Sequence, residues 1–334
     1  AVDGGGRMTL VAGGSGDPDV PPPVSLHASP LCLDDGTILT VDPNGAALLR
    51  LSPDLILLNR IPLAALPDAA PVQLDGGAVA LPVEPTQRYR HGVLGDEVEA
   101  AGVALVDPTS GDVLGRWNVT GRRVVEDRRV VAWPDAGRWG LVATVSGAGD
   151  GGALLVLAGT EGAARLSAVA VAVGLGQEQE QRWRHVLGAS GPRLYSVAAP
   201  HLGGPLERWT LPAAGGVLAR EAFELGVTSH REGDRTLDLG RVLPSAPGDP
   251  VGRDLLLLPT RDLRALALIA CDGSGCRVVA RSDLGAPLAA APLATRAADG
   301  ATVVRAATRD GRLVRIRFPD LAGVPGDGIL TDPE

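Results

Sequence analysis

Three residues of this sequence have the chemistry of a divalent-cation site, provided that the fold brings them together. Glu84 and Asp135 offer carboxylate oxygens and His201 offers an imidazole nitrogen, and each lies near the end of an apolar run. Carboxylate oxygens suit Ca²⁺. The sequence therefore contains one candidate metal site. The alternative is that the three are unrelated loop residues, because the turns that follow strands are generally polar.

The histidines as a group do not indicate a haem or a transition-metal site. There are five, at positions 27, 91, 185, 201 and 230, and no two of them are four residues apart. The sequence has no Cys-x-x-Cys-His segment, which excludes covalent attachment of a c-type haem. We therefore expect scattered surface or strand histidines. The sequence also lacks a convincing nucleophile elbow and a phosphate-binding loop, so no cofactor is predicted.

Two short segments mix charged residues with histidine. One spans residues 178–185 and ends in Trp183, Arg184 and His185, and the other spans residues 230–235. Each is either an interaction loop or a solvated connection between strands.

The cysteines help to define the compartment. Cys271 and Cys276 flank an Asp-Gly-Ser-Gly turn, where the two strands of a hairpin approach closely enough for a disulfide. A reduced pair and half of a zinc site are the alternatives, although no second pair of ligands is suitably spaced. Cys32 stands in an apolar run and is predicted to be a buried thiol. A disulfide is typical of an oxidising compartment. The sequence begins with Ala1 in place of an initiator Met, as a mature secreted protein would. We therefore expect a secreted or periplasmic protein whose signal peptide has been removed.

Composition excludes several classes of protein. Hydrophobic residues make up 45% of the 334 residues but aromatic residues only 3%, so the core must be built from Val, Leu and Ala. The formal net charge is −8 and all basic residues are Arg, which argues against nucleic acid as a partner. No apolar run reaches the roughly 18 residues that a membrane-spanning helix needs.

Short apolar runs that alternate with tight turns must position any site. Residues 31–63 are the clearest example, with four short strands separated by turns at 34–36, 42–45 and 52–54. Asp and Asn accept hydrogen bonds from the backbone of a turn, Pro fixes φ and Gly accepts positive φ. Alternation with a period of two dominates throughout, so we expect strands and no helix.

The same arrangement returns along the chain. One series of turns, at 36, 75–77, 126–128, 190–191, 252–254 and 299–300, precedes apolar strands, and a second precedes Arg-rich strands. The first series spans Gly36 to Gly300, a mean spacing of about 53 residues, slightly above the ~40–50 of propeller blades. This predicts an all-β, single β-propeller of six four-stranded blades, with seven as the alternative.

The last repeat, from residue 292 to 318, has room for only three strands. A strand near residues 7–12 could supply the fourth and close the ring, since closure removes exposed strand edges. The predicted organisation is an N-terminal extension at 1–26, a β-propeller at 27–324 and a C-terminal tail at 325–334.

One segment resembles a known repeat. Residues 104–117, from Ala104 through Asp107, Thr109 and Gly111 to Trp117, resemble the Ala-x-Asp-x-x-Thr-Gly-x-x-x-Trp-like segment of quinoprotein-like (PQQ-type) β-propellers. The match is shifted by one residue at Ala104 and between Thr109 and Gly111, and no other repeat carries the Trp. The resemblance implies the propeller architecture over most of the chain. It does not imply the quinone cofactor or dehydrogenase activity.

Two functions fit these observations. The first is a non-catalytic scaffold or protein-binding subunit of a larger assembly, which holds a protein partner through loops on one rim. The second is a metal-dependent propeller hydrolase or lyase, with Glu84, Asp135 and His201 at the mouth of the central channel. A quinone-dependent oxidoreductase is a weaker third. We expect the scaffold, and enzymatic activity stays an open alternative.

Overall fold

The computed structural model describes residues 23–135, 138–147, 151–159, 166–172, 183–210, 216–235, 237–243 and 253–318. The chain forms two compact units, one of residues 1–91 and 97–181 and one of residues 92–96 and 182–334. The predicted closing strand at residues 7–12 and the predicted tail at 325–334 lie outside the described residues.

The first unit begins with a four-stranded antiparallel sheet in the order β1-β2-β3-β4. Its strands are β1 (Leu31–Cys32), β2 (Ile38–Val41), β3 (Ala47–Leu51) and β4 (Leu57–Pro62). The turn before β3 shows why the sequence folds this way. Asp42 Oδ1 accepts hydrogen bonds from the backbone N–H of Ala46 at 2.7 Å and of Asn44 at 3.2 Å. Gly45 has a φ of 72°, and a Cβ there would lie 2.2 Å from the carbonyl oxygen of Ala65.

Two further sets of strands complete the first unit. Their strands are β5 (Val72–Gln73), β6 (Val79–Thr86), β7 (Glu99–Val106) and β8 (Val113–Asn118), then β10 (Val131–Asp135), β11 (Arg138–Gly147), β12 (Gly151–Gly159) and β13 (Leu166–Ala172). Within each set, neighbours in sequence pair antiparallel. The short strand β9 (Val124–Val125) joins the sets, because it pairs with both β7 and β11.

The expected turn at residues 126–128 is wrong. In the other repeats this turn lies between the first and second strands, but here residues 126–128 follow β9 and precede β10, the first strand of its set. Asp135 pairs with Arg138, so the connection between β10 and β11 comes after residue 135. The sequence was misleading because Val124 and Val125 look like the end of an apolar strand before a turn. In the structure they form the short strand β9, which pairs with β7 and β11.

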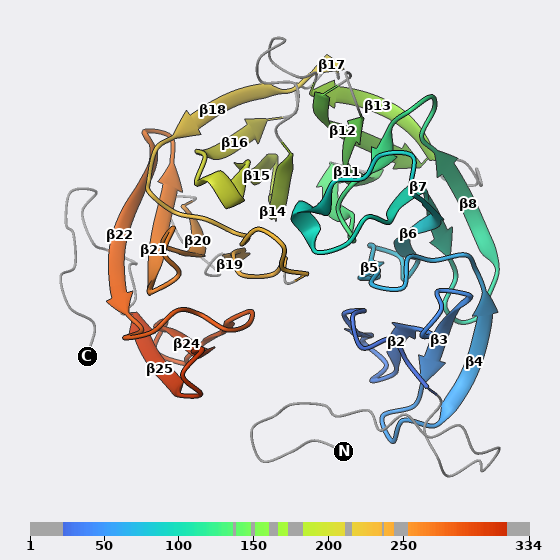
Figure 1. Cartoon of the computed structure of the whole chain (residues 1–334), viewed down its shortest axis with the longest axis horizontal. Helices are drawn as coiled ribbons and strands as arrows, with labels where there is room; N and C mark the ends of the chain where they lie inside the picture. Colours follow the sequence, from blue (N-terminus) through green and yellow to red (C-terminus); the bar gives the residue numbers. More distant parts are fainter. Residues whose placement is uncertain are drawn as a thin grey trace. The chain divides into compact units, whose positions relative to one another are not determined.

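The second unit contains the 3₁₀ turns η1 (Gly92–Leu94) and η3 (Pro200–Leu202) and three sheets (Figure 1). The strands of the three sheets are β14 (Arg184–Ser190), β15 (Arg193–Ala198), β16 (Leu206–Thr210) and β18 (Ala219–Phe223), then β19 (Arg241–Leu243), β20 (Asp254–Pro259), β21 (Ala265–Asp272) and β22 (Gly275–Asp283), and last β23 (Leu293–Arg296), β24 (Thr302–Ala307) and β25 (Leu313–Phe318). The two-residue strand β17 (Gly216–Val217) is not part of these three sheets. The final sheet has three strands in the described residues, as expected from the sequence.

The described residues contain no α-helix, as the period-two pattern predicts. Accordingly, none of their helical turns is long and apolar enough to cross a lipid bilayer. The antiparallel four-stranded sheets also agree with the predicted blades. The number of blades in the whole chain stays a prediction.

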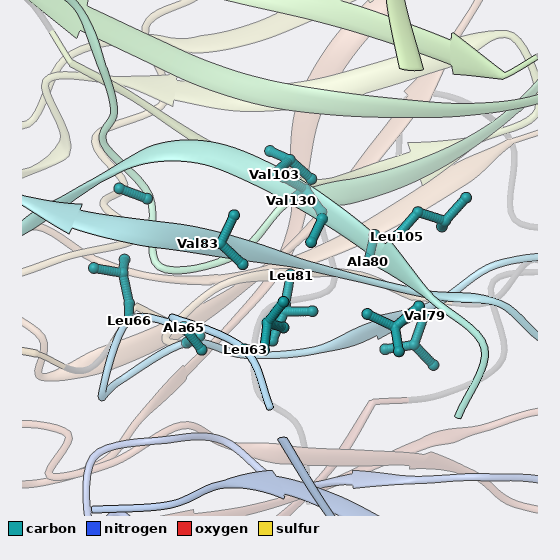
Figure 2. Packing of buried hydrophobic residues seen from close by; sticks show 14 of the residues in the cluster. Leu63, Ala65, Leu66, Val79, Ala80, Leu81, Val83, Val103, Leu105 and Val130 are labelled. Atoms are coloured by element: carbon teal, nitrogen blue, oxygen red, sulfur yellow. The ribbon is translucent and has the colours of Figure 1, made fainter. Parts of the chain in front are cut away.

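Small aliphatic side chains fill the core. Figure 2 shows part of it in the first unit, where Leu81 and Val83 of β6 lie close to Val103 of β7 and Leu66. All of these side chains are buried. Full burial of one Val or Leu side chain contributes about 1.5–3 kcal/mol, so many modest contributions replace a few large aromatic ones.

The cysteine predictions had different outcomes. Cys271 and Cys276 face each other across the β21–β22 hairpin and form a disulfide, with their Cα atoms 4.1 Å apart. This confirms the predicted bond. The prediction for Cys32 is wrong, because its thiol is free and exposed. Cys32 lies on β1, a two-residue strand at the edge of its sheet, which has too little neighbouring structure to cover it.

The disulfide gives a direct test of hairpin stability. We expect the double variant Cys271→Ala, Cys276→Ala to lose about 2 kcal/mol of unfolding free energy, because a closed loop this short restricts the unfolded chain only modestly. Urea unfolding monitored by tryptophan fluorescence measures the loss. Cys32→Ala is the matched control and should leave the midpoint unchanged. Equal midpoints for the double variant and the wild type would contradict the prediction.

Candidate functional site

Glu84 occupies an unusual place at the far end of β6. Its φ is 62°, in the left-handed region of the backbone that residues other than glycine rarely adopt. Its backbone N–H donates to Ala64 O at 2.6 Å. The carboxylate is half-buried and lies 3.6 Å from the guanidinium of Arg116. Glu84 is therefore held by its backbone, and its charge has a weak partner.

The strand register does not bring Glu84 and Asp135 together. Asp135 is opposite Arg138 at one end of β11, whereas Val145 near the other end is opposite Val125. Val125 faces Ala100, which in turn faces Pro85, the neighbour of Glu84. Seven residues of extended chain separate Arg138 from Val145, or about 23 Å at ~3.3 Å per residue.

His201 belongs to the second unit, in η3. Among side chains that the structure describes, no group of three His, Cys, Asp or Glu could hold a metal ion. The side chain of Asp135 lies outside them, so the metal site predicted from Glu84, Asp135 and His201 stays a prediction.

Three histidines instead converge on one tryptophan in the second unit. The ring of Trp183 stacks on those of His185 and His201, with centroids 5.5 and 6.4 Å away, and meets His230 edge-on at 5.1 Å. Trp183, His185 and His230 are buried and His201 is partly exposed. We call these four residues the Trp183 cluster.

Backbone contacts position the members of the Trp183 cluster. The N–H of Ala199, which has a φ of 40°, donates to Trp183 O at 2.7 Å and so sets η3 beside the tryptophan. Thr228 Oγ1 lies 2.7 Å from Pro200 O and 2.9 Å from His230 O, which ties the loop carrying His230 to η3. These contacts fix two segments about 30 residues apart in sequence.

Hydrogen bonds orient the buried imidazoles. His185 Nδ1 lies 2.8 Å from Ser229 Oγ, and His230 Nε2 lies 2.5 Å from Asp234 O. Burial, together with the nearby His201, lowers the pKa of His230 to about 4. His230 is therefore neutral at physiological pH and donates its Nε2 proton to Asp234 O. The described arrangement is thus a buried aromatic cluster with one partly exposed member, His201.

The expectation of scattered histidines is wrong for three of the five. The two segments that mix charge with histidine contribute Trp183 and His185 from one and His230 from the other. Residues 183 and 185 are two apart near the start of a strand, which places them on one face, and the sequence shows that much. The approach of His201 and His230 depends on chain segments that only the fold brings close.

A second ionisable group lies in the first unit. The Nδ1 atom of His91 contacts a carboxylate oxygen of buried Glu126, and this hydrogen bond raises the pKa of His91. The other oxygen of Glu126 accepts a hydrogen bond from Ser146. Burial, with the charge of Glu126, raises the pKa of Tyr89 to about 12. Both carboxylate oxygens thus have partners in the fold.

One strand edge exposes apolar side chains. Ile56, Leu57 and Leu58 are 51%, 42% and 53% exposed at the start of β4, the terminal strand of the first sheet. Further along β4, Gly111 lies close to the side chains of Asn59 and Ile61. We call Ile56, Leu57 and Leu58 the β4 edge.

No protein-family model and no curated protein matches the chain. Solved structures do match. A catalytically inactive variant of virginiamycin B lyase from Staphylococcus aureus, with quinupristin, aligns at a TM-score of 0.51 and 8% identity over 94% of this chain and 85% of that one. Selenomethionine-substituted virginiamycin B lyase from the same organism gives 0.49 and 11% over 91% and 88%. A streptogramin B lyase gives 0.47 and 9% over 91% and 81%.

At 8% identity, the likeness with a TM-score of 0.51 shows the fold alone. Together with the antiparallel sheets, it confirms the all-β propeller predicted from the sequence. The resemblance of residues 104–117 to PQQ-type repeats stays a prediction.

The low pKa of His230 predicts a pH-dependent stability. An unfolded histidine binds its proton near pH 6.5, whereas folded His230 binds it only near pH 4. Unfolding therefore takes up a proton between these values, and the unfolding free energy should fall by up to about 3 kcal/mol as the pH drops from 6.5 to 4. We expect His230→Asn to flatten this slope in urea unfolding measured at several pH values.

The exposed His27 provides the control, since His27→Asn should leave the slope as it is. His91 acts in the opposite direction, because its raised pKa stabilises the fold at low pH and this stabilisation is lost as the pH rises through the folded pKa. An unchanged slope in His230→Asn would show that His230 is not the group responsible.

Proposed function

We propose that this chain is a non-catalytic propeller that binds a protein partner through the β4 edge. The single observation that supports the proposal is the run of three consecutive exposed apolar side chains at a sheet edge. Ile56 precedes β4, and the register between β3 and β4 shifts at Leu58, so the three exposed side chains mark an irregular strand start that little structure covers. Contiguous exposed apolar surface is typical of interaction sites.

Other terminal strands carry charge that discourages pairing with foreign strands. Arg116 lies within β8, Arg220 within β18, and Arg315 and Arg317 within β25. Exposed charges of this kind protect sheet edges from association. β4 carries one such charge, Arg60, which lies 2.6 Å from Asp42, and the segment between Leu55 and Asn59 carries none. The partner is therefore expected to offer an extended apolar segment that lies along β4.

An oxidising compartment fits this proposal. The Cys271–Cys276 bond is of the kind that persists outside the reducing cytosol. We accordingly propose that the partner is secreted, periplasmic or displayed on a surface.

A charge placed on the β4 edge should weaken partner binding. We expect a partner isolated with the wild-type protein from its native host to bind Leu57→Arg at least about ten-fold more weakly, because an arginine must be desolvated in an apolar interface. The measurement is a titration with the purified partner. Leu313→Arg is the matched control, since Leu313 is a lone apolar residue, 73% exposed, at the start of β25.

Binding that is unchanged in Leu57→Arg, or lost equally in Leu313→Arg, would contradict the proposal. Self-association of the wild type that Leu57→Arg abolishes would identify a second copy of this chain as the occupant.

A metal-dependent hydrolase or lyase is the second candidate function. What favours it is the sequence pattern, in which Glu84, Asp135 and His201 each lie near the end of an apolar run. The three histidines around Trp183 do not by themselves form a metal-binding group. Elemental analysis of the purified protein tests it. If this candidate is right, the wild type holds one metal ion per chain, and His201→Ala loses it, whereas the exposed control His27→Ala keeps it. A metal-free wild type would end this candidate.

A further inference from the structure

A cleft of about 770 Å³ lies in the second unit, at the β20–β21 turn. Its charged and hydroxyl lining consists of Thr260, Arg261, Asp262, Arg264, Arg281 and Asp283. Three arginines therefore line one concave surface on a protein whose net charge is −8. The volume is in the range of small-molecule sites.

The three arginines are held in place through backbone carbonyls. Arg264 Nη2 donates to Gly285 O and Arg281 Nη2 donates to Leu225 O, each at 3.3 Å. Arg261 Nη2 donates to Gly203 O. Each guanidinium has five N–H donors, so one carbonyl leaves most of them available. The arginines are thus positioned without being neutralised.

The carboxylates of the cleft accept hydrogen bonds from neighbouring residues of their own turns. Asp262 Oδ1 accepts hydrogen bonds from Thr260 Oγ1 at 2.6 Å and from the backbone N–H of Arg264 at 3.1 Å, and these bonds lower the pKa of Asp262. Asp283 Oδ1 accepts the backbone N–H of Gly285 at 2.7 Å.

Ion pairing of the three arginines is weak. Among the described residues, their one ion pair joins Arg261 to Glu224 at 3.9 Å, and Glu224 is 74% exposed. An exposed contact at that distance contributes little. By contrast, Arg208 lies 2.7 Å from Glu221 in the same unit. The cleft therefore has positive charge that its own acids do not fully compensate.

We propose that this cleft binds a small hydrophilic molecule that carries two or more carboxylate or phosphate groups. Guanidinium groups bind both anions through paired N–H donors. The lining contains no aromatic side chain, and Ala265 is its one apolar side chain, so the body of the ligand is polar. This site is separate from the β4 edge and does not depend on the protein-binding role.

Calorimetric titration at low ionic strength tests the site, with citrate as the carboxylate probe and inorganic pyrophosphate as the phosphate probe. We expect the wild type to bind at least one of them with a Kd below about 1 mM. Arg264→Gln and Arg281→Gln should each weaken binding at least about ten-fold. Arg122→Gln is the control, because Arg122 is an exposed residue of the first unit.

Arg264→Lys separates a built site from general charge attraction. It keeps the charge but loses the planar fork, so a built site should bind the probe several-fold more weakly. Stronger binding of citrate would identify carboxylates as the natural groups, and stronger binding of pyrophosphate would identify phosphates. Wild-type affinity in Arg264→Gln and Arg281→Gln, an equal loss in Arg122→Gln, or no binding of either probe by the correctly folded wild type would overturn the proposal.

Discussion

Burial of the central strands on both faces is the constraint on which the rest of this structure depends. All six residues of β20 are buried, and so are six of the eight in β21. With few aromatic side chains, the strands must pack closely through Val, Leu and Ala, and the turns between them must be tight. Asp42 and Gly45 show how one such turn is built. Functional groups are consequently expected at strand ends, in loops and on edges.

Charges inside the sheets are tolerated only where several partners surround them. Glu207 is fully buried, and its carboxylate lies 3.0 Å from Arg184 Nε and 2.8 Å from Arg220 Nη1. Asp254 accepts a hydrogen bond from Tyr195 at 2.5 Å. Removing one partner would leave a buried charge uncompensated, which is costly. We therefore interpret these networks as structural, and the carbonyl-bound arginines of the β20–β21 cleft as available for a ligand.

The Trp183 cluster combines both kinds of environment. His230 is neutral and bonded to a backbone carbonyl, whereas His201 is partly exposed on η3. Leu94 and Leu237 pack with Trp183 and exclude water from its ring. Protonation of His230 would place a charge in this apolar setting, so low pH should loosen the contacts between η3 and the 228–230 loop. The cluster thus links local stability to the position of His201.

The sequence by itself determined the strands, because alternating aliphatic residues and turns rich in Asp and Gly are local properties. It also determined the Cys271–Cys276 bond, since a hairpin fixes that distance. Only the tertiary structure decided that β9 bridges two sets of strands and that Cys32 is exposed. Likewise, His201 and His230 meet at Trp183 through contacts between separate loops. Pairing between distant segments depends on packing and register, which no short stretch of sequence encodes.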